Sequence, residues 1–223
     1  MPETRWTKLF LDAADTVLSS DPPGDDGSVT YETDGKGVTF LGEPFDAETE
    51  ITGPIALKLF ISSGTSDADV FAVVRVFEPN GDKVTFQGAI DPHTPVAQGW
   101  LRASHRRLDP DLSLPYRPYH AHDREEPLTP GDVYELDIEI WPTSIVIPAG
   151  YQLGLTIRGS DYEYEGDRGE NRLGTFKNEL TGVGPFLHDD PIDRPDGVFG
   201  GLVTVHTGPG TPSQLLLPVI ARS

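Results

Sequence analysis

The sequence contains no cysteine and a single methionine among its 223 residues. The absence of cysteine excludes thiol catalysis, thiolate-bound metals and disulfide bonds, and it is typical of a reducing compartment. Apolar stretches are short as well, and none approaches the roughly 20 residues that a membrane-spanning helix requires. Residues 1–6 do not lead from a basic segment into an apolar run, so they lack the pattern of a secretory signal. We therefore predict a cytoplasmic protein.

Positive charge is also scarce. Lysine and arginine together number 17 against 36 aspartates and glutamates, which gives a formal net charge of -19. Nucleic acids and anionic membrane surfaces are bound by cationic faces, which this composition does not favour. We predict that neither nucleic acid nor membrane is a partner.

Long helices are not expected, because 24 glycines and 21 prolines interrupt the chain at short intervals. Ile55, Leu57, Leu59 and Ile61 alternate with other residues, which is the period of a half-buried strand. Similar short runs predict further strands over residues 6–11, 29–31, 38–41, 70–77, 84–90, 133–140, 144–147, 152–158, 202–206 and 215–220.

This number of strands favours two packed, mainly antiparallel sheets over a single open sheet, so we predict an all-β sandwich or jelly roll. Residues 28–223 would form one domain, and residues 1–27 a linker strand and acidic loop that pack on it. Asn80-Gly81 would make a tight hairpin turn after the strand 70–77, with residues 84–90 as the returning strand.

A serine nucleophile of the α/β-hydrolase type needs the pattern G-x-S-x-G at a turn from a strand into a helix. The nearest match, Gly64 to Ala68, precedes the apolar strand 70–77 instead of a helix. We interpret it as a hairpin turn and predict no catalytic residue in the chain.

Two long polar segments, residues 91–128 and 161–196, are candidates for binding or packing on a partner. His120, His122 and Asp123 could supply metal ligands, and the acidic run 188–196 could hold calcium. Neither segment has the ligand spacing of a known metal motif, so hydrogen-bonded or solvated loops are favoured. We predict no metal and no cofactor.

Aromatic residues suggest two binding surfaces. Tyr162 and Tyr164 lie among acidic residues, a composition that suits either sugar stacking or a protein interface, and the sequence does not decide between them. Although the chain is acidic, basic and aromatic residues cluster at residues 99–106. We predict that Trp100, Arg102, His105 and Arg106, together with His120, His122 and Asp123, contact another domain, with Arg102 beside Trp100 as an ion-pair or cation-π anchor.

The ordered series of short motifs resembles one known family. It comprises Gly53-Pro54, Asp67-Ala68-Asp69, Pro79-Asn80-Gly81, residues 99–106, Leu128 to Gly131, Trp141 to Ser144, Pro148-Ala149-Gly150 and Pro212 to Val219. Across residues 30–220 this series resembles the C-terminal β-sandwich domain of the X-Pro dipeptidyl-peptidase and cocaine-esterase (CocE/NonD) serine hydrolases. The sequence departs from the family at Asn80, which keeps the turn chemistry, and at Tyr151-Gln152.

The resemblance implies a jelly roll similar to galactose-binding domains, packed beside an α/β-hydrolase domain that carries the catalytic triad in the same or another chain. It implies no catalytic role for this chain, which would support the catalytic domain, shape the substrate entrance or form contacts in a homo-oligomer. The alternative is an independent carbohydrate-binding module that uses Tyr162 and Tyr164.

Overall fold

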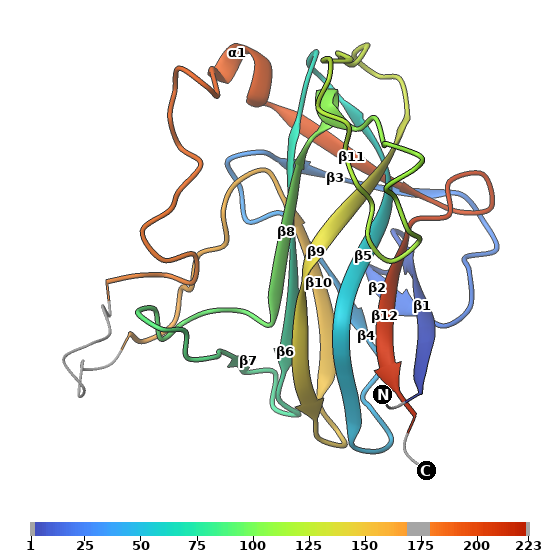
Figure 1. Ribbon diagram of the computed structural model, residues 1–223, viewed down its shortest axis with the longest axis vertical. Helices are drawn as coiled ribbons and strands as arrows, with labels where there is room; N and C mark the ends of the chain where they lie inside the picture. The colour runs from blue at the N-terminus through green and yellow to red at the C-terminus, as the bar shows by residue number, and fades with distance from the viewer. Residues whose placement is uncertain (1–2, 169–178, 222–223) are drawn as a thin grey trace.

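The computed structural model describes residues 3–168 and 179–221, and nearly all of the regular structure in them is β-strand (Figure 1). The strands are β1 (Thr4–Asp12), β2 (Val17–Ser19), β3 (Gly27–Glu32), β4 (Val38–Gly42), β5 (Thr49–Ser63), β6 (Asp69–Phe77), β7 (Lys83–Val84), β8 (Ala97–Arg102), β9 (Tyr134–Ile147), β10 (Gln152–Arg158), β11 (Leu202–Thr207) and β12 (Gln214–Ile220). A 3-10 turn, Ala103–His105, and one short helix, α1 (Asp196–Phe199), interrupt the connections.

The strands form two layers. In one layer β5 is central: β9 pairs with one of its edges, and β12 and β11 pair with the other. Strand β1 pairs with the outer edge of β12, and β3 pairs with the outer edge of β11. In the other layer β10 lies between β4 and β6, and β7 and β8 pair with the free edge of β6. The short parallel pair of β2 with β4 joins the layers, and the other pairings are antiparallel. The predicted all-β sandwich is confirmed.

Strand β1 lies between β12 and β2, hydrogen-bonded to both, so the N-terminal segment is built into the sheet. Figure 1 shows the start of β1 and the end of β12 side by side at the lower end of the molecule, where Thr4 pairs with Ile220. It also shows β3 and β11 crossing the long strands near the upper end.

The core lies between the layers. Ile55, Leu57, Leu59 and Ile61 are fully buried, as their alternation predicts. They face inward with alternate residues of β9, β6 and β10, among them Ile138, Val74 and Leu155. Burying an aliphatic side chain of this size contributes about 1.5–3 kcal/mol, so repeated alternation on several strands supplies the stability that disulfides give to smaller domains.

Strand β9 is continuous across Trp141-Pro142, although the sequence predicts two strands there. The register between β5 and β9 shifts between Gly53 and Ile55, where Pro54 faces Trp141 and Pro142. Proline cannot donate to a sheet ladder, and a bulge is where a strand tolerates it. Because of the bulge, β5 continues through Pro54 and β9 continues through Pro142.

One turn prediction is wrong, and a second is confirmed with a shorter returning strand than predicted. Residues 64–68 do not form a hairpin, because β5 and β6 lie in different layers and do not pair. The turn at Asn80-Gly81 does form, with Gly81 at a φ of 89°, but the returning strand is only Lys83–Val84. Beyond it, Phe86 makes a single isolated bridge with Thr94. The edge of β6 is then occupied by β8, which lies inside the segment predicted to be irregular.

The two layers meet most closely where β8 passes β9. A Cβ atom on Gly99 would lie 2.1 Å from the carbonyl oxygen of Glu139 and 2.9 Å from the Cα of Ile140. Glycine is required here because the backbones approach too closely for any side chain. The approach also brings Trp100 of β8 next to Trp141 of β9.

Candidate functional site: an aromatic seam and its ionic support

Four charged residues, Asp69, Arg102, Asp193 and Arg194, form a network that we call the ionic support. It begins with a pair across two neighbouring strands. Asp69, the first residue of β6, lies opposite Arg102, the last residue of β8. The Arg102 guanidinium donates to both Asp69 oxygens, from Nε at 2.9 Å and from Nη2 at 3.1 Å. Such bidentate geometry is the strong form of an ion pair. The hydrogen bonds that Arg102 donates to Asp69 raise the pKa of Arg102 above its ordinary value.

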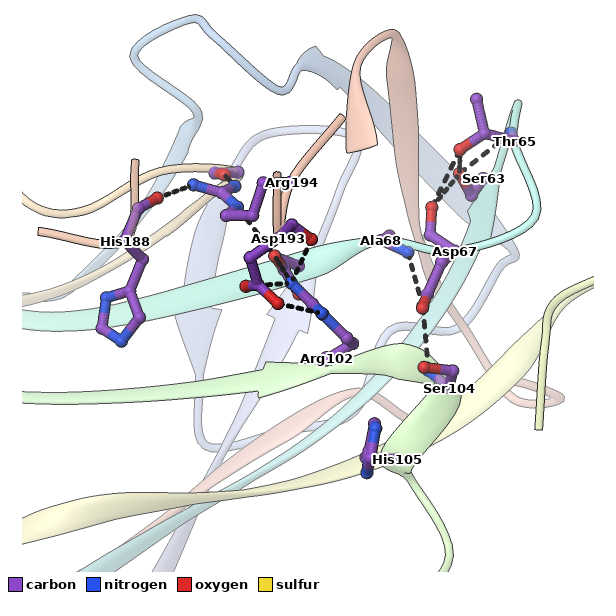
Figure 2. A network of polar contacts seen from close by, with 12 residues as sticks. Ser63, Thr65, Asp67, Ala68, Arg102, Ser104, His105, His188, Asp193 and Arg194 are labelled. Carbon is purple, nitrogen blue, oxygen red and sulfur yellow. Dashed lines mark hydrogen bonds and ion pairs between the residues drawn. The ribbon is translucent and has the colours of Figure 1, made fainter. Parts of the chain in front are cut away.

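The same pair holds the segment that leads to α1. Arg102 also donates to Asp193, with Nη2 3.0 Å from Oδ2, and its guanidinium lies 4.2 Å from the ring centroid of Phe199. Arg194 donates from Nε to Asp69 at 2.8 Å and from its other nitrogens to the carbonyl oxygens of His188 and Gly159 (Figure 2). Asp69 thus lies between two arginines. Asp193 completes the network, and its pKa is lowered chiefly by the hydrogen bonds from Arg102.

Asp67 fixes the crossing between the layers. Its Oδ1 accepts from the backbone nitrogens of Ala68 and Ser104, each at 2.9 Å, and its carbonyl oxygen accepts from Thr65 at 2.8 Å. Figure 2 shows these groups converging on Asp67 at the start of β6. Together, the two aspartates of Asp67-Ala68-Asp69 attach the ends of β5, β6 and β8 to one another.

Above this support lies a continuous run of rings, which we call the aromatic seam: Phe71, Trp100, Trp141 and His188. The Trp100 ring centroid lies 5.3 Å from that of Trp141 and 5.2 Å from that of His188. His188 in turn contacts buried Phe71 at 5.5 Å. Trp100 is 39% exposed and Trp141 is 62% exposed, so much apolar area of the seam faces outward.

His188 is fixed by more than its ring contacts. Its backbone nitrogen donates to Asp161 Oδ2 at 2.7 Å, and its Nδ1 lies 3.0 Å from Asp161 Oδ1. A hollow of about 190 Å³ lies beside the ring, between Trp100, Phe71 and the ion pairs of Arg102 and Arg194. The seam is therefore a pre-formed surface with an apolar top and a charged base.

The other residues predicted from the cationic cluster separate into two groups. Arg106 is committed within the domain: it donates to the carbonyl oxygens of Ala103 and Glu126, and its guanidinium lies 4.7 Å from the Tyr134 ring centroid. Arg102 is likewise committed, to Asp69 and Asp193 rather than to Trp100. The ion pairs that Arg102 forms in the structure therefore lie within this chain.

His105, His120 and His122 gather on the far side of the 3-10 turn, and His105 points away from the ionic support (Figure 2). The Nδ1 atoms of His105 and His122 lie 3.2 Å apart, and Asp123 pairs with Arg107. Within residues 3–168 and 179–221, no group of three or more histidine, aspartate or glutamate side chains is placed to hold a metal ion.

The two tyrosines differ in accessibility. Tyr162 is 4% exposed, and the Arg75 guanidinium lies 5.4 Å from its ring centroid. Tyr164 stacks on His93 with centroids 4.4 Å apart. Only Tyr164 therefore offers a partly exposed ring.

Sequence reasoning missed Asp69, Arg194, Trp141 and His188 as parts of one site. Asp69 and Trp141 stand in motifs that the resemblance used, but nothing in the spacing shows that the segment 186–194 returns to β6 and β8. That contact joins residues more than a hundred positions apart in the chain, as the pair of Arg194 with Asp69 shows.

The fold and this site define a class: a β-sandwich with a solvent-facing aromatic surface and, in the part of the chain that the structure describes, no helix long and apolar enough to cross a membrane. The family described as the X-Pro dipeptidyl-peptidase C-terminal non-catalytic domain matches residues 1–216, and the chain belongs to it.

Relatives and solved structures agree with this assignment. A putative serine esterase of Mycobacterium bovis is 33% identical over 133 residues, which cover 57% of this chain and 19% of that protein. Cocaine esterase of Rhodococcus sp. is 24% identical over 174 residues, covering 78% and 24%. A crystal structure of a CocE/NonD family hydrolase from Staphylococcus aureus superimposes with a TM-score of 0.79 at 28% identity, covering 99% of this chain and 37% of that one. The chain thus spans a quarter or less of these curated relatives.

Proposed function

We propose that this chain is the accessory partner of an acyl hydrolase that cleaves esters or X-Pro peptides, and that it docks on the catalytic domain through the aromatic seam. The observation that carries the proposal is the match of residues 1–216 to a non-catalytic domain, together with the 37% share of a CocE/NonD hydrolase that the chain spans. The remaining share of such a hydrolase is the partner that the proposal requires, in the same chain or in another.

The seam is the surface best suited to this contact. Interfaces are centred on aromatic residues, and Trp is the most enriched residue at their energetic centres. Trp100 and Trp141 are adjacent and exposed on a rigid support, whereas Trp6, which is 40% exposed, lies on β1 and stacks on Tyr116. By contact with the seam, the domain would shape one wall of the substrate entrance.

The carbohydrate-binding alternative has less support. A sugar-stacking platform must expose the face of its ring, and Tyr162 is buried beneath Arg75. One accessible ring, Tyr164, would have to supply the stacking alone.

A chimaera tests the accessory role. This chain would replace the matching C-terminal region of the Staphylococcus aureus CocE/NonD hydrolase, with which it shares 28% identity. We expect the chimaera to hydrolyse a p-nitrophenyl acyl ester and the same hydrolase without any C-terminal region to lose that activity. A truncated hydrolase as active as the intact one would contradict the accessory role.

The chain by itself provides the complementary test. We expect it neither to turn over the ester nor to react with a fluorophosphonate probe, because Ser66 precedes β6 instead of standing at a strand-to-helix turn. Labelling of any serine in the chain would overturn the non-catalytic assignment.

A further inference from the structure

Four cationic side chains surround one hollow on the outer face of the β4–β10–β6 layer. The hollow has a volume of about 550 Å³, and Lys36, Arg75, Lys83 and Arg158 line it, with Asp15, Glu163 and Glu165 as acidic neighbours. Acidic residues outnumber basic ones by about two to one in the whole chain, 36 against 17. The local excess of positive charge therefore runs against the composition of the protein.

The two arginines differ from those of the ionic support. Arg102, Arg106 and Arg194 each pair with a carboxylate. Arg75 and Arg158, although half-buried, form no ion pair with any residue in 3–168 or 179–221. A guanidinium withdrawn from water is normally paired, but Arg75 and Arg158 are compensated only by the less direct charges of Glu163 and Glu165.

Arg75 is held by rings and a hydroxyl. Its guanidinium lies 5.3 Å from the ring centroid of Phe77 and 5.4 Å from that of Tyr162, and Nη1 is 3.4 Å from Thr156 Oγ1. Cation-π contacts of this kind orient a guanidinium and leave its nitrogens free to donate. Gly154 lies opposite Arg75 on β10, and a Cβ there would lie 2.6 Å from the Phe77 ring, so the glycine makes room for this arrangement.

Arg158, at the end of β10, also keeps donors free. Its Nη2 donates to Ser160 Oγ at 3.1 Å, but its Nε is buried and has no hydrogen-bond partner among the described residues. A buried unpaired donor costs about 1–3 kcal/mol, which an acceptor from outside would recover.

Electrostatics within the hollow point in the same direction. Burial is the main cause that lowers the pKa of both Arg75 and Arg158, and the nearby charge of Glu165 opposes this effect without cancelling it. Burial, followed by the charge of Arg75, lowers the pKa of Lys83. Each of these groups would regain stability from a nearby negative charge.

One carboxylate, that of Glu165, already pairs with the two lysines that line the hollow. Glu165 Oε1 lies 2.9 Å from Lys36 Nζ and its Oε2 lies 3.8 Å from Lys83 Nζ, and its side chain is half-exposed on a loop. Hydrogen bonding to Lys36 is the main cause that lowers the pKa of Glu165. Glu165 demonstrates that the rim accepts an oxyanion, while the arginine side remains without one.

We propose that this hollow binds a small compound bearing a phosphoryl or carboxylate group, whose oxygens are held by Arg75 and Arg158 and whose remainder lies against Phe77. Arginine suits this task because its planar donors match both kinds of oxyanion. The volume lies in the range of pockets for small molecules. The site is independent of the proposed hydrolase partner, since none of its lining residues belongs to the aromatic seam.

Calorimetric titration of the purified chain tests the site with three probes: inorganic phosphate, sulfate and citrate, at neutral pH and at constant ionic strength set with sodium chloride. We expect saturable binding of at least one probe at a single site. Binding of phosphate or sulfate alone would assign a phosphoryl-type ligand, and binding of citrate alone a polycarboxylate. No saturable binding of any probe would overturn the proposal.

Variants locate the binding. Arg75→Gln and Arg158→Gln should each weaken it about tenfold or more, the amount expected when hydrogen bonds to a charged group are removed. Arg124→Gln makes the same charge change at an exposed arginine paired with Glu126, outside the hollow, and should bind as the unmodified chain does. Equal loss in all three variants, or loss in none, would refute the site.

A measurement on the unmodified chain covers the case in which a variant fails to fold. Amide shifts in a two-dimensional NMR titration should concentrate on Thr39, Phe77 and Thr156. Shifts centred on any other part of the molecule would contradict the assignment.

Discussion

At the scale of single residues, Asp69 is the carboxylate that joins two arginines of the ionic support. Its side chain is 10% exposed and receives hydrogen bonds from Arg102 and Arg194, which come from β8 and from the segment before α1. Removing its charge would leave Arg194 without its carboxylate partner and Arg102 with Asp193 alone. The residue thus links the strand framework to the segment that carries His188.

Asp69→Asn should therefore destabilise the domain by about 3 kcal/mol, because it breaks largely buried pairs and leaves the charge of Arg194 without a carboxylate partner. Urea unfolding followed by circular dichroism measures this change. Asp123→Asn is the matched control: it makes the same substitution in the exposed pair with Arg107, and we expect little change. Equal effects of the two substitutions would show that Asp69 has no special role.

Two histidines make stability depend on pH. Burial is the main cause that lowers the pKa of His120 and the sole cause that lowers that of His206, below the ordinary value of about 6.5. Between that value and the lower folded-state pKa, the unfolded chain binds protons that the folded chain does not. The free energy of unfolding should therefore fall as the pH drops from 7 through 6.

The double variant His120→Gln, His206→Gln should flatten this dependence. Urea titrations at several pH values between 7.5 and 5.5 measure the slope. Asp193, Asp123 and Glu165 have lowered pKa values and lose their contribution only at lower pH, so they do not obscure this window. A slope that the double variant leaves unchanged would refute the assignment to these two residues.

At the scale of elements, β8 closely approaches the backbone of β9 at Gly99. Because this approach places Trp100 against Trp141, the aromatic seam depends on an element contact as well as on its own rings. Any side chain at position 99 would push the two strands apart.

Gly99→Ala should cost about 3 kcal/mol, since its Cβ would collide with the backbone of Glu139 and overpacking of this kind is rarely relieved locally. Gly24→Ala, whose Cβ would meet nothing within 4 Å, should change the free energy of unfolding by no more than about 0.5 kcal/mol. Thermal unfolding of the two variants compares them. A Gly99→Ala chain as stable as the control would show that the strands separate without cost.

The elements also show how far the sequence predicts the fold. Alternation identifies β5 well, because a half-buried strand imposes a period of two on its side chains, and short apolar runs identify β6 and β10. It misses β8, whose residues lie in a proline- and histidine-rich segment, and it divides β9 at Pro142, where a bulge in the pairing with β5 absorbs the proline. The hairpin predicted at residues 64–68 fails because turn residues do not reveal which layer the next strand joins.

The candidate site is less predictable than the strands. Trp100 and Arg102 are visible as a cationic and aromatic exception in an acidic chain, but the partners that give them their roles come from remote segments. Arg102 finds Asp69 and Asp193, and Trp100 finds Trp141 and His188. Only the tertiary pairing brings these residues together.

At the scale of the whole molecule, the two surfaces that we propose to be functional lie on different parts of the sandwich. The aromatic seam runs along β8 and β9, and the cationic hollow lies on the outer face of β4, β10 and β6. The chain belongs to a family of non-catalytic domains, and the first surface suits docking while the second suits a small ligand. The two can be tested separately because they share no lining residue.

The central claim is that the aromatic seam, and no other tryptophan surface, contacts the catalytic domain. The most direct measurement is ester turnover by the Staphylococcus aureus chimaera with Trp100→Ala and Trp141→Ala, compared with the chimaera carrying Trp6→Ala. We predict that the double seam variant loses most of its activity, while Trp6→Ala retains turnover. Full activity of the seam variant, with Trp6→Ala impaired instead, would contradict the account.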